Sequence, residues 1–373
     1  METYHLKSKL VENDKEFVIQ TNNDANLGAI LSTVYVDGQV TEKVQCPHPQ
    51  EMNPEELLSL VKLTHQEQKW EIETLLDAYR KALAGGNAEM VYHLGTAFFY
   101  KRLFDEARQL FQAAVTLNRD HHQAFNYLGM TQLALNMVAE AIESCSIAVE
   151  KRPAFADYRN NLGEALLADN SCQRAVRELE EAVRINLYYA DAYFNLGLTF
   201  VLDALNIEGS VSRADLPAKA ADYFKKASLI CPDYEATLLE EAMSALHRSD
   251  LKGAFSVFLK VREAKKEKHR REFAAFYMKF VMYPDWVSEE VIGDRIRFLQ
   301  AEIEKNPTYV DLHTELARCF LEYAKLSWQE GLQQYKKTLQ INPSLTRAQH
   351  CLDKVEREYE NIGSVLSDIA EKS

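Results

Sequence analysis

The chain has 373 residues, a formal net charge of −13 and 47% hydrophobic residues, so it can bury a large core. The acidic balance disfavours sequence-independent nucleic-acid binding by the whole molecule, because attraction to phosphates needs a basic face. The sequence shows no long apolar run and no basic-then-apolar leader, so we expect a cytoplasmic protein without a membrane span.

Residues 1–50 are expected to form a small antiparallel β module with three strands. We predict the strands at Phe17–Ile19, Ala29–Val36 and Val40–Val44, with Asp37-Gly38 as a favoured two-residue hairpin turn. The polar segment Thr21–Gly28 is expected to be a loop between the first two strands. A sheet this small must pack on a helix or on another chain to be stable.

A long helix from Pro54 to Ala84 is predicted to link this module to the rest of the chain, as a capping segment over residues 51–86. Asn53 is a suitable N-cap, and Pro54 suits the first turn of a helix. The buried side of this helix is expected to carry Leu57, Val61, Trp70, Leu75, Tyr79 and Leu83.

Four glycines, each preceded by leucine, recur at one fixed spacing in the middle of the chain: Gly95, Gly129, Gly163 and Gly197. Alanines return at two fixed positions after each of the first three glycines, beginning with Ala107 and Ala114. A fixed period of about 34 residues is typical of stacked helix–turn–helix units. The small residues are expected where the two helices of one pair approach closely, because a larger side chain would push them apart.

This pattern resembles the tetratricopeptide repeat, and the resemblance extends from Asn87 to about Asp233. Phe111 and Phe224 occupy the aromatic position of the second helix, whereas Cys145 and Leu179 depart from it. The resemblance implies a right-handed superhelix with a concave binding face. The expected fold is therefore an all-α solenoid of helix pairs with a small three-stranded N-terminal β module. The resemblance implies no catalysis.

We assign the repeats to residues 87–268, with an insertion near residues 206–216. The insertion is either a tolerated surface loop or part of a functional edge, and we favour the surface loop. Degenerate helical repeats are expected over residues 269–343, with helices His269–Met282 and Ser288–Lys305 and a helix pair over Val310–Pro343. Residues 344–373 are expected to form a C-terminal capping helix and a tail.

Lys260–Arg271 (KVREAKKEKHRR) concentrates basic residues against the acidic average of the chain. Such a patch is able to attract an acidic partner or RNA. It lacks interleaved aromatic residues, and its glutamates suit pairing with lysines on the same helix. The solvated helix face is therefore the favoured interpretation.

No catalytic motif is present: the sequence lacks a nucleophile elbow, a phosphate-binding glycine loop and metal-spaced cysteines. His121 and His122 point apart on a helix start, so we expect no metal site there. The six scattered cysteines are expected to be buried free thiols in a reducing compartment. We therefore predict a protein that is not an enzyme and needs no cofactor or metal.

The resemblance implies that the first helix of each pair lines the concave groove with the residues three before, one after and four after its glycine. The asparagines among them either hold the backbone of an extended peptide or brace neighbouring helices, and both alternatives are open. The lysines and arginine that the family uses to clamp a C-terminal carboxylate are absent, because Tyr92, Thr96, Asp157 and Asn161 occupy those positions. The predicted groove residues are Tyr92, Thr96, Phe99, Asn126, Met130, Leu133, Asn160, Asn161, Glu164, Leu167, Phe194, Asn195, Leu198 and Val201.

The sequence thus favours a non-catalytic protein–protein interaction scaffold that binds a peptide or helix of another protein in this groove. One alternative is a self-assembling structural protein that associates through the β edge or the solenoid ends. Another is an accessory subunit that recruits substrate to a separate enzyme.

Overall fold

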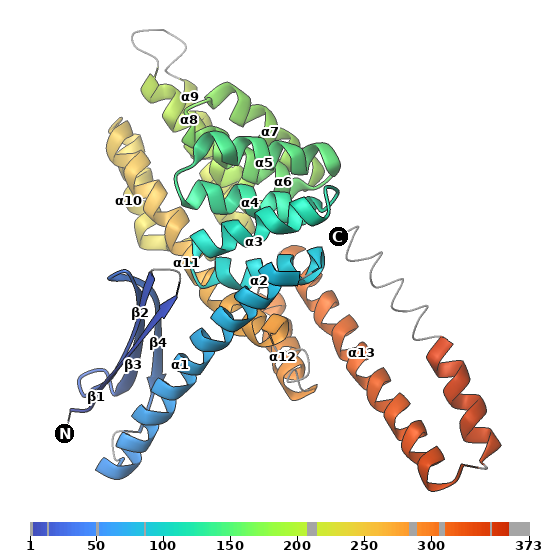
Figure 1. The fold of residues 1–373 in the computed structure, drawn as a ribbon. Coiled ribbons are helices and arrows are strands. Elements are labelled where there is room, and N and C mark those ends of the chain that lie inside the picture. The colour runs from blue at the N-terminus through green and yellow to red at the C-terminus, as the bar shows by residue number, and fades with distance from the viewer. Residues whose placement is uncertain are drawn as a thin grey trace. The chain divides into compact units, whose positions relative to one another are not determined.

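A computed structural model describes residues 3–12, 15–49, 52–85, 87–206, 215–282, 289–305, 310–343 and 345–357 (Figure 1). The chain divides into two compact units, one of residues 1–229 and 233–282 and the other of residues 230–232 and 283–373. Of the insertion expected near residues 206–216, residues 207–214 lie outside the described ranges, as do residues 358–373 of the expected C-terminal tail.

The N-terminal module is an antiparallel sheet of four strands, not three, in the order β1-β2-β3-β4. The prediction missed β1 because its sequence, HLKSKLVE, alternates weakly and exposes every second residue. The segment Thr21–Asp24, predicted as a loop, continues β2, because Thr21 and Asn23 are buried on the inner side of the sheet. The strands are β1 (His5–Glu12), β2 (Lys15–Asp24), β3 (Ala29–Val36) and β4 (Gln39–Pro47).

The turn between β3 and β4 is the predicted Asp37-Gly38 hairpin. Both residues have positive φ, 48° at Asp37 and 81° at Gly38, and Val36 pairs with Gln39 across the turn. A turn with two positive φ values matches the twist of the flanking strands, which is why this dipeptide favours a hairpin.

Helix α1 (Pro54–Gly85) confirms the predicted long helix and packs against the sheet. Its start is capped by Asn53, whose Oδ1 accepts a hydrogen bond from Glu56 N at 2.9 Å. Phe17, Ile19 and Val34 from the sheet share one core with the second half of α1 and with the first repeat helices. Trp70 and Leu83, predicted on the buried side, are 40% and 44% exposed, so the buried stripe is narrower than expected.

The repeats form four successive helix pairs in the first unit, as the regular spacing of the glycines predicts. A Cβ on Gly95 would lie 2.8 Å from Phe111 Cε1, and one on Gly163 would lie 2.6 Å from Leu179 Cγ. The glycines therefore stand where the helices of a pair touch. The pairs are α2 (Ala88–Tyr100) with α3 (Phe104–Leu117), α4 (His122–Ala134) with α5 (Val138–Lys151), α6 (Ala156–Ala168) with α7 (Cys172–Ile185), and α8 (Ala190–Asn206) with α9 (Asp215–Ile230).

The turn inside each of the first three pairs repeats the same backbone. Arg102, Asn136 and Asn170, which occupy the same place in successive repeats, have φ of 60°, 59° and 61°. In the first turn, Leu103 N donates to Phe98 O at 2.9 Å and Arg102 N donates to Phe99 O at 3.0 Å. This is the Schellman bonding that ends a helix and aims the next helix back along it.

After the fourth pair, α10 (Ala236–His247) packs against α11 (Leu251–Met282). Helix α11 is 32 residues long and continues through the expected boundary at residues 268 and 269, so no separate helix begins at His269. Its first half is anchored by a buried apolar stripe at Leu251, Ala254, Phe258 and Val261. The ring of Phe258 stacks on that of Phe224 with centroids 3.6 Å apart.

The second unit contains α12 (Glu289–Lys305), α13 (Val310–Ile341) and a helical segment at residues 346–357. The described part of α12 agrees with the predicted Ser288–Lys305 helix. Helix α13 is a single helix where a pair was expected. No proline interrupts it, and Gly331, which is exposed, lies inside the helix and does not end it. Within the described ranges, no helix is long and apolar enough to cross a membrane.

Candidate functional site

The predicted groove residues stand on the first helices of the four pairs, α2, α4, α6 and α8, and those on α2 lie among aromatic rings. Tyr92 and Phe99, both half-buried on α2, lie with ring centroids 5.8 and 5.5 Å from Tyr127 on α4. Both contacts are edge-on, the arrangement that aromatic rings prefer. These rings form a partly open apolar patch over the first two repeats.

Asparagines connect neighbouring repeats along the same side. Asn161 Nδ2 donates to Asn126 Oδ1 at 3.0 Å, and Asn195 Nδ2 donates to Asn160 Oδ1 at 2.9 Å. Each bond joins the first helix of one pair to the first helix of the next. These contacts support the bracing alternative for all four asparagines, and their contact with a ligand stays a prediction.

The predicted groove residues divide into two groups by exposure. Thr96 belongs to the buried group, and its hydroxyl donates to Tyr92 O within the same helix at 3.1 Å. Fewer residues are therefore accessible to a partner than were predicted to line the groove. The half-buried residues are Tyr92, Phe99, Met130, Leu133, Asn161 and Glu164, and the buried ones are Thr96, Asn126, Asn160, Leu167, Phe194, Asn195, Leu198 and Val201.

Helix α11 of the same chain lies against α2 and α8, on the groove side of the repeats. Arg262 Nη1 donates to Asn195 Oδ1 at 3.3 Å and lies 3.7 Å from Glu164 Oε1. Lys266 forms an ion pair with Glu164 as well. Residues 260–271 of α11 thus contact two of the residues that were predicted to line the groove, Glu164 and Asn195.

The interpretation of this stretch as a solvated helix face is wrong for several of its residues. Lys265 is only 5% exposed, forms an ion pair with Asp191 on α8 and lies 4.8 Å above the ring of Tyr234. Burial of a lysine is tolerated where a carboxylate and an aromatic face replace its water. Sequence spacing alone does not show that a helix so distant along the chain folds back over the groove.

Glu164 is the acidic centre of the groove. Burial alone would raise the pKa of this carboxyl, but the charges of Lys266 and Arg262 more than offset burial and hold the pKa below its ordinary value. The carboxylate is therefore ionised at neutral pH, and its charge is matched by cations from α11.

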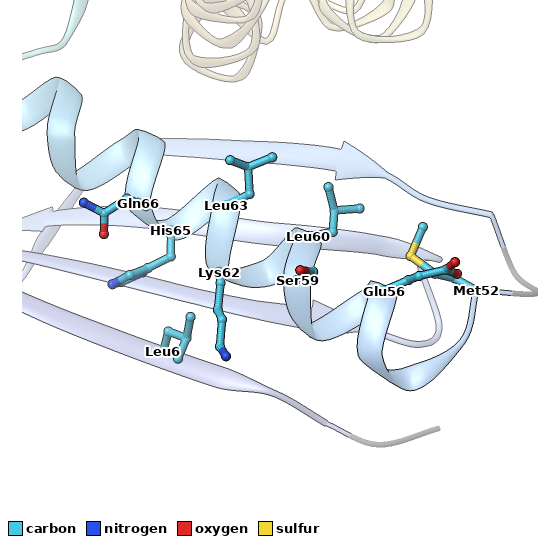
Figure 2. Close-up of a pocket in the computed structure, with 9 residues that line it drawn as sticks. All are labelled: Leu6, Met52, Glu56, Ser59, Leu60, Lys62, Leu63, His65 and Gln66. Carbon is cyan, nitrogen blue, oxygen red and sulfur yellow. The ribbon is translucent and has the colours of Figure 1, made fainter.

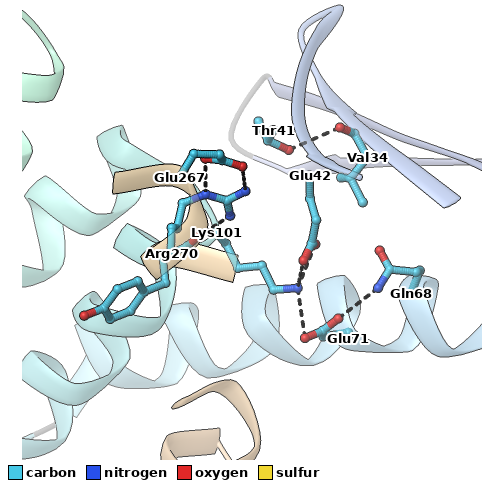
Figure 3. Close-up of polar contacts among 9 residues, drawn as sticks. Val34, Thr41, Glu42, Gln68, Glu71, Lys101, Glu267 and Arg270 are labelled. Atoms are coloured by element: carbon cyan, nitrogen blue, oxygen red, sulfur yellow. Dashed lines mark hydrogen bonds and ion pairs between the residues drawn. The ribbon is translucent and has the colours of Figure 1, made fainter. Parts of the chain in front are cut away.

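Arg270, in the middle of α11, reaches the first repeat (Figure 3). Arg270 Nη1 donates to Tyr100 O at 2.9 Å, and Glu267 accepts two bonds from the same guanidinium. Tyr100 is the last residue of α2, where a cation is favoured by the exposed carbonyl groups of a helix end.

Beside this contact, Lys101 joins the sheet, α1 and α2 (Figure 3). It is 4% exposed, and its Nζ lies 2.6 Å from Glu42 Oε1 on β4 and 3.0 Å from Glu71 Oε1 on α1. Burial lowers the pKa of Lys101, but the two carboxylates raise it above its ordinary value overall. The β module is thereby held on the repeats by a buried ion cluster, which we call the Lys101 cluster.

An open hollow of about 820 Å³ lies between β1 and the first half of α1 (Figure 2). Its lining is mainly apolar, and His65 is the titratable ring in it. Both ring nitrogens of His65 form hydrogen bonds, Nε2 with Ser8 Oγ at 2.8 Å and Nδ1 with Thr21 Oγ1 at 3.0 Å. Burial lowers the pKa of His65. The hollow therefore offers mainly apolar surface, and its histidine is engaged within the fold. It is lined by Leu6, Met52, Glu56, Ser59, Leu60, Lys62, Leu63, His65 and Gln66.

His121 and His122 point to different partners, as expected. His121 Nε2 lies 3.2 Å from Glu89 Oε2, and His122 Nδ1 lies 2.7 Å from the hydroxyl of Tyr158. Over the described ranges, no three histidine, cysteine, aspartate or glutamate side chains lie close enough together to hold a metal ion. All six cysteines are free, but Cys46 and Cys351 are half-buried rather than buried as expected. Burial raises the pKa of Cys145 to about 12, which makes it a poor nucleophile.

A family model described as tetratricopeptide repeat matches residues 92–156 and 128–187. A UDP-N-acetylglucosamine–peptide N-acetylglucosaminyltransferase of Giardia intestinalis is 28% identical over 109 residues, which are 29% of this chain and 7% of the transferase. Human tetratricopeptide repeat protein 13 is 32% identical over 79 residues, which are 21% of this chain and 9% of that protein. The chain spans less than a tenth of the length of these curated relatives.

Among solved structures, a thermophilic tetratricopeptide repeat protein of Thermus thermophilus is similar over 51% of this chain and 98% of its own length. It is 24% identical, with a TM-score of 0.37.

Proposed function

We propose that this chain, whose residues 92–187 match a family model described as tetratricopeptide repeat, is a non-catalytic scaffold that binds a peptide or helical segment of another protein in its concave groove. The observation that carries this proposal is the position of α11. A helix makes side-chain contacts with Glu164 and Asn195, two of the residues predicted from the repeat pattern to line the groove. These contacts support a groove whose polar groups suit a helix.

The half-buried aromatic residues support binding at the other end of the groove. Tyr92 and Phe99 present partly exposed rings that are fixed by neighbouring rings. Fixed aromatic side chains lose little conformational entropy when they bind, and they dominate many interfaces.

We propose in addition that the chain is not an enzyme, and the state of its histidines and of one buried cysteine supports this. The histidines at the repeat junction are paired with Glu89 and Tyr158, and the Cys145 thiol is protonated at neutral pH. The transferase relative matches this chain over only 7% of its length, so its activity gives no support for an enzyme here.

Self-assembly through the sheet edge has weaker support. In the described sheet, β1 is bonded to β2 alone and β4 to β3 alone, so each of these two edges could take another strand, and β1 is the N-terminal one. Lys7 and Lys9 are exposed on this strand, and lysines on edge strands oppose pairing with a second copy.

An affinity pull-down from native lysate tests the proposal. The variant Phe99→Glu with Met130→Glu places charge in the half-buried groove, and the control Leu117→Glu with Leu229→Glu changes two exposed leucines, 57% and 84% exposed. We expect one protein to be captured by the wild type and the control and lost from the groove variant. Capture of the same proteins by all three would overturn the proposal.

A further inference from the structure

We propose that the groove recognises a helix rich in lysine and arginine, and that residues Arg262–Arg270 of α11 occupy the groove until such a partner helix displaces them. We call these residues the basic segment. This inference rests on the proposed function, because it assigns the chemistry of the partner and the regulation of the same groove.

The charges of the groove match a cationic helix. Glu164 on α6 is contacted by Arg262 and Lys266, and Asp191 on α8 is contacted by Lys265. Glu164 has only 12% of its side chain exposed, so a bound helix must replace its water with cationic groups. An acidic or apolar helix would leave this carboxylate without a counter-charge.

The cations follow helical spacing. Arg262, Lys265, Lys266 and Arg270 stand at positions i, i+3, i+4 and i+8, which places them on neighbouring rows of one helix side. A separate helix with cations at the same spacing presents the same groups to Glu164, Asp191 and the carbonyl of Tyr100. The partner is therefore a helix with lysine or arginine at these four positions.

The two halves of α11 are held differently. Its first half is fixed by buried apolar side chains, including Phe258 against Phe224. The basic segment is held by polar contacts: Lys265 is buried against Asp191, whereas Lys266 and Lys268 expose about half of their side chains, 47% and 51%. Ion pairs with this exposure are weak and are screened by salt. The basic segment is thus able to leave while the first half stays anchored.

The fit of the basic segment is also incomplete. Arg262 Nε is buried and forms no hydrogen bond among the described residues; Glu263 Oε1 lies 3.6 Å from it, too far for a hydrogen bond. A buried donor without a partner weakens the complex that contains it. A partner helix that satisfies every donor competes with the internal segment despite the high effective concentration of the internal one.

The test uses the full chain and a fluorescein-labelled peptide with the sequence of residues 258–270 (FLKVREAKKEKHR). Fluorescence anisotropy measures its affinity for the wild type and for Arg262→Gln with Lys266→Gln, which removes two contacts of the basic segment. We expect the variant to bind the peptide about tenfold more tightly, because weakening two ion pairs frees the groove. A third variant that adds Glu164→Gln is expected to lose this gain.

Two controls separate the inference from a general effect of charge. Lys225→Gln with Lys252→Gln removes the same charge from exposed positions and is expected to match the wild type. A peptide with glutamine in place of all its lysines and arginines is expected not to bind. Equal affinity of the labelled peptide for the wild type and the Arg262→Gln, Lys266→Gln variant overturns the inference.

A second variant tests the same inference without removing a charge, and amide exchange shows whether the rest of the protein stays folded. Ala264→Pro breaks the helix between the apolar anchor and most of the basic segment without changing a charge, and residue 264 is exposed. We expect it to gain peptide affinity and to speed amide exchange after residue 264 while residues 251–260 stay protected. Unchanged affinity and exchange contradict the inference. The proposed function survives that result if Phe99→Glu with Met130→Glu still loses its protein partner.

Discussion

Asn195 on α8 donates its side-chain amide to Asn160 on α6 at 2.9 Å, and both side chains are nearly fully buried. Asn160 stands three positions before the glycine of its repeat and Asn195 two before the next glycine, so the bond joins consecutive repeats slightly out of register. The same relationship recurs between Asn161 and Asn126. Amide pairs therefore join the first helices of consecutive repeats.

We predict that Asn195→Ala lowers the free energy of unfolding by about 1–3 kcal/mol, because it leaves the buried Asn160 amide without its donor. Chemical denaturation of the two single variants and of Asn160→Ala with Asn195→Ala measures the coupling. Additive losses from the two single variants would show that the bond contributes nothing.

A second prediction concerns the glycines that mark the repeats. Gly163→Ala is expected to cost about 1–3 kcal/mol, since its Cβ would lie 2.6 Å from Leu179 Cγ. Adding Leu179→Ala is expected to recover part of this overpacking cost, at the expense of buried apolar area. Gly85→Ala, with no atom within 4 Å of its Cβ, is the matched control and is expected to be close to neutral. If Gly163→Ala and Gly85→Ala unfold alike, the close helix contact is not what selects glycine.

The repeats could be predicted because their spacing and their small residues are set by contacts within a single helix pair. The steric demand at Gly95 and Gly163 can be read from a single helix pair, and the hairpin at Asp37-Gly38 depends on two residues. Strand β1 was missed since its alternation is weak and its inner residues are only partly buried. Its pairing with β2 depends on the whole sheet.

The contents of the groove were not predictable for a different reason. The pattern around each glycine places Glu164 and Asn195 on the first helices, but their contacts come from Arg262 and Lys266 on α11. A charge run such as residues 260–271 has the same sequence pattern whether it faces water or an acidic groove. Only the long-range packing of α11 distinguishes the two.

The Lys101 cluster yields a third prediction. Lys101→Met is expected to cost about 1–3 kcal/mol of unfolding free energy, because the half-buried carboxylates of Glu42 and Glu71 lose their cation. Adding Glu42→Gln and Glu71→Gln is expected to restore much of the loss, as the charges then disappear together. Thermal denaturation of the wild type, Lys101→Met and the triple variant makes the comparison. A triple variant no more stable than Lys101→Met would contradict this account of the cluster.

The fourth prediction is a pH dependence at His122. Burial, followed by the charges of Arg152 and His121, lowers the pKa of His122 from 6.5 to about 4. Between these values the unfolded chain takes up the proton and the folded chain does not, so His122 makes unfolding easier as the pH falls from 6.5 towards 4. Denaturation midpoints of the wild type and His122→Gln are expected to converge over this range. Parallel pH profiles would show that His122 titrates normally in the folded protein.

The central claim is that another protein binds in the concave groove, and site-specific photocross-linking tests it most directly. The photoreactive residue p-benzoylphenylalanine is placed at Leu133, which is half-buried in the groove, or at Leu229, which is 84% exposed on α9. After irradiation in native lysate, we predict a cross-linked partner from position 133 that is absent from position 229 and suppressed by excess unlabelled FLKVREAKKEKHR peptide. A partner cross-linked equally from both positions, or only from position 229, would contradict the account.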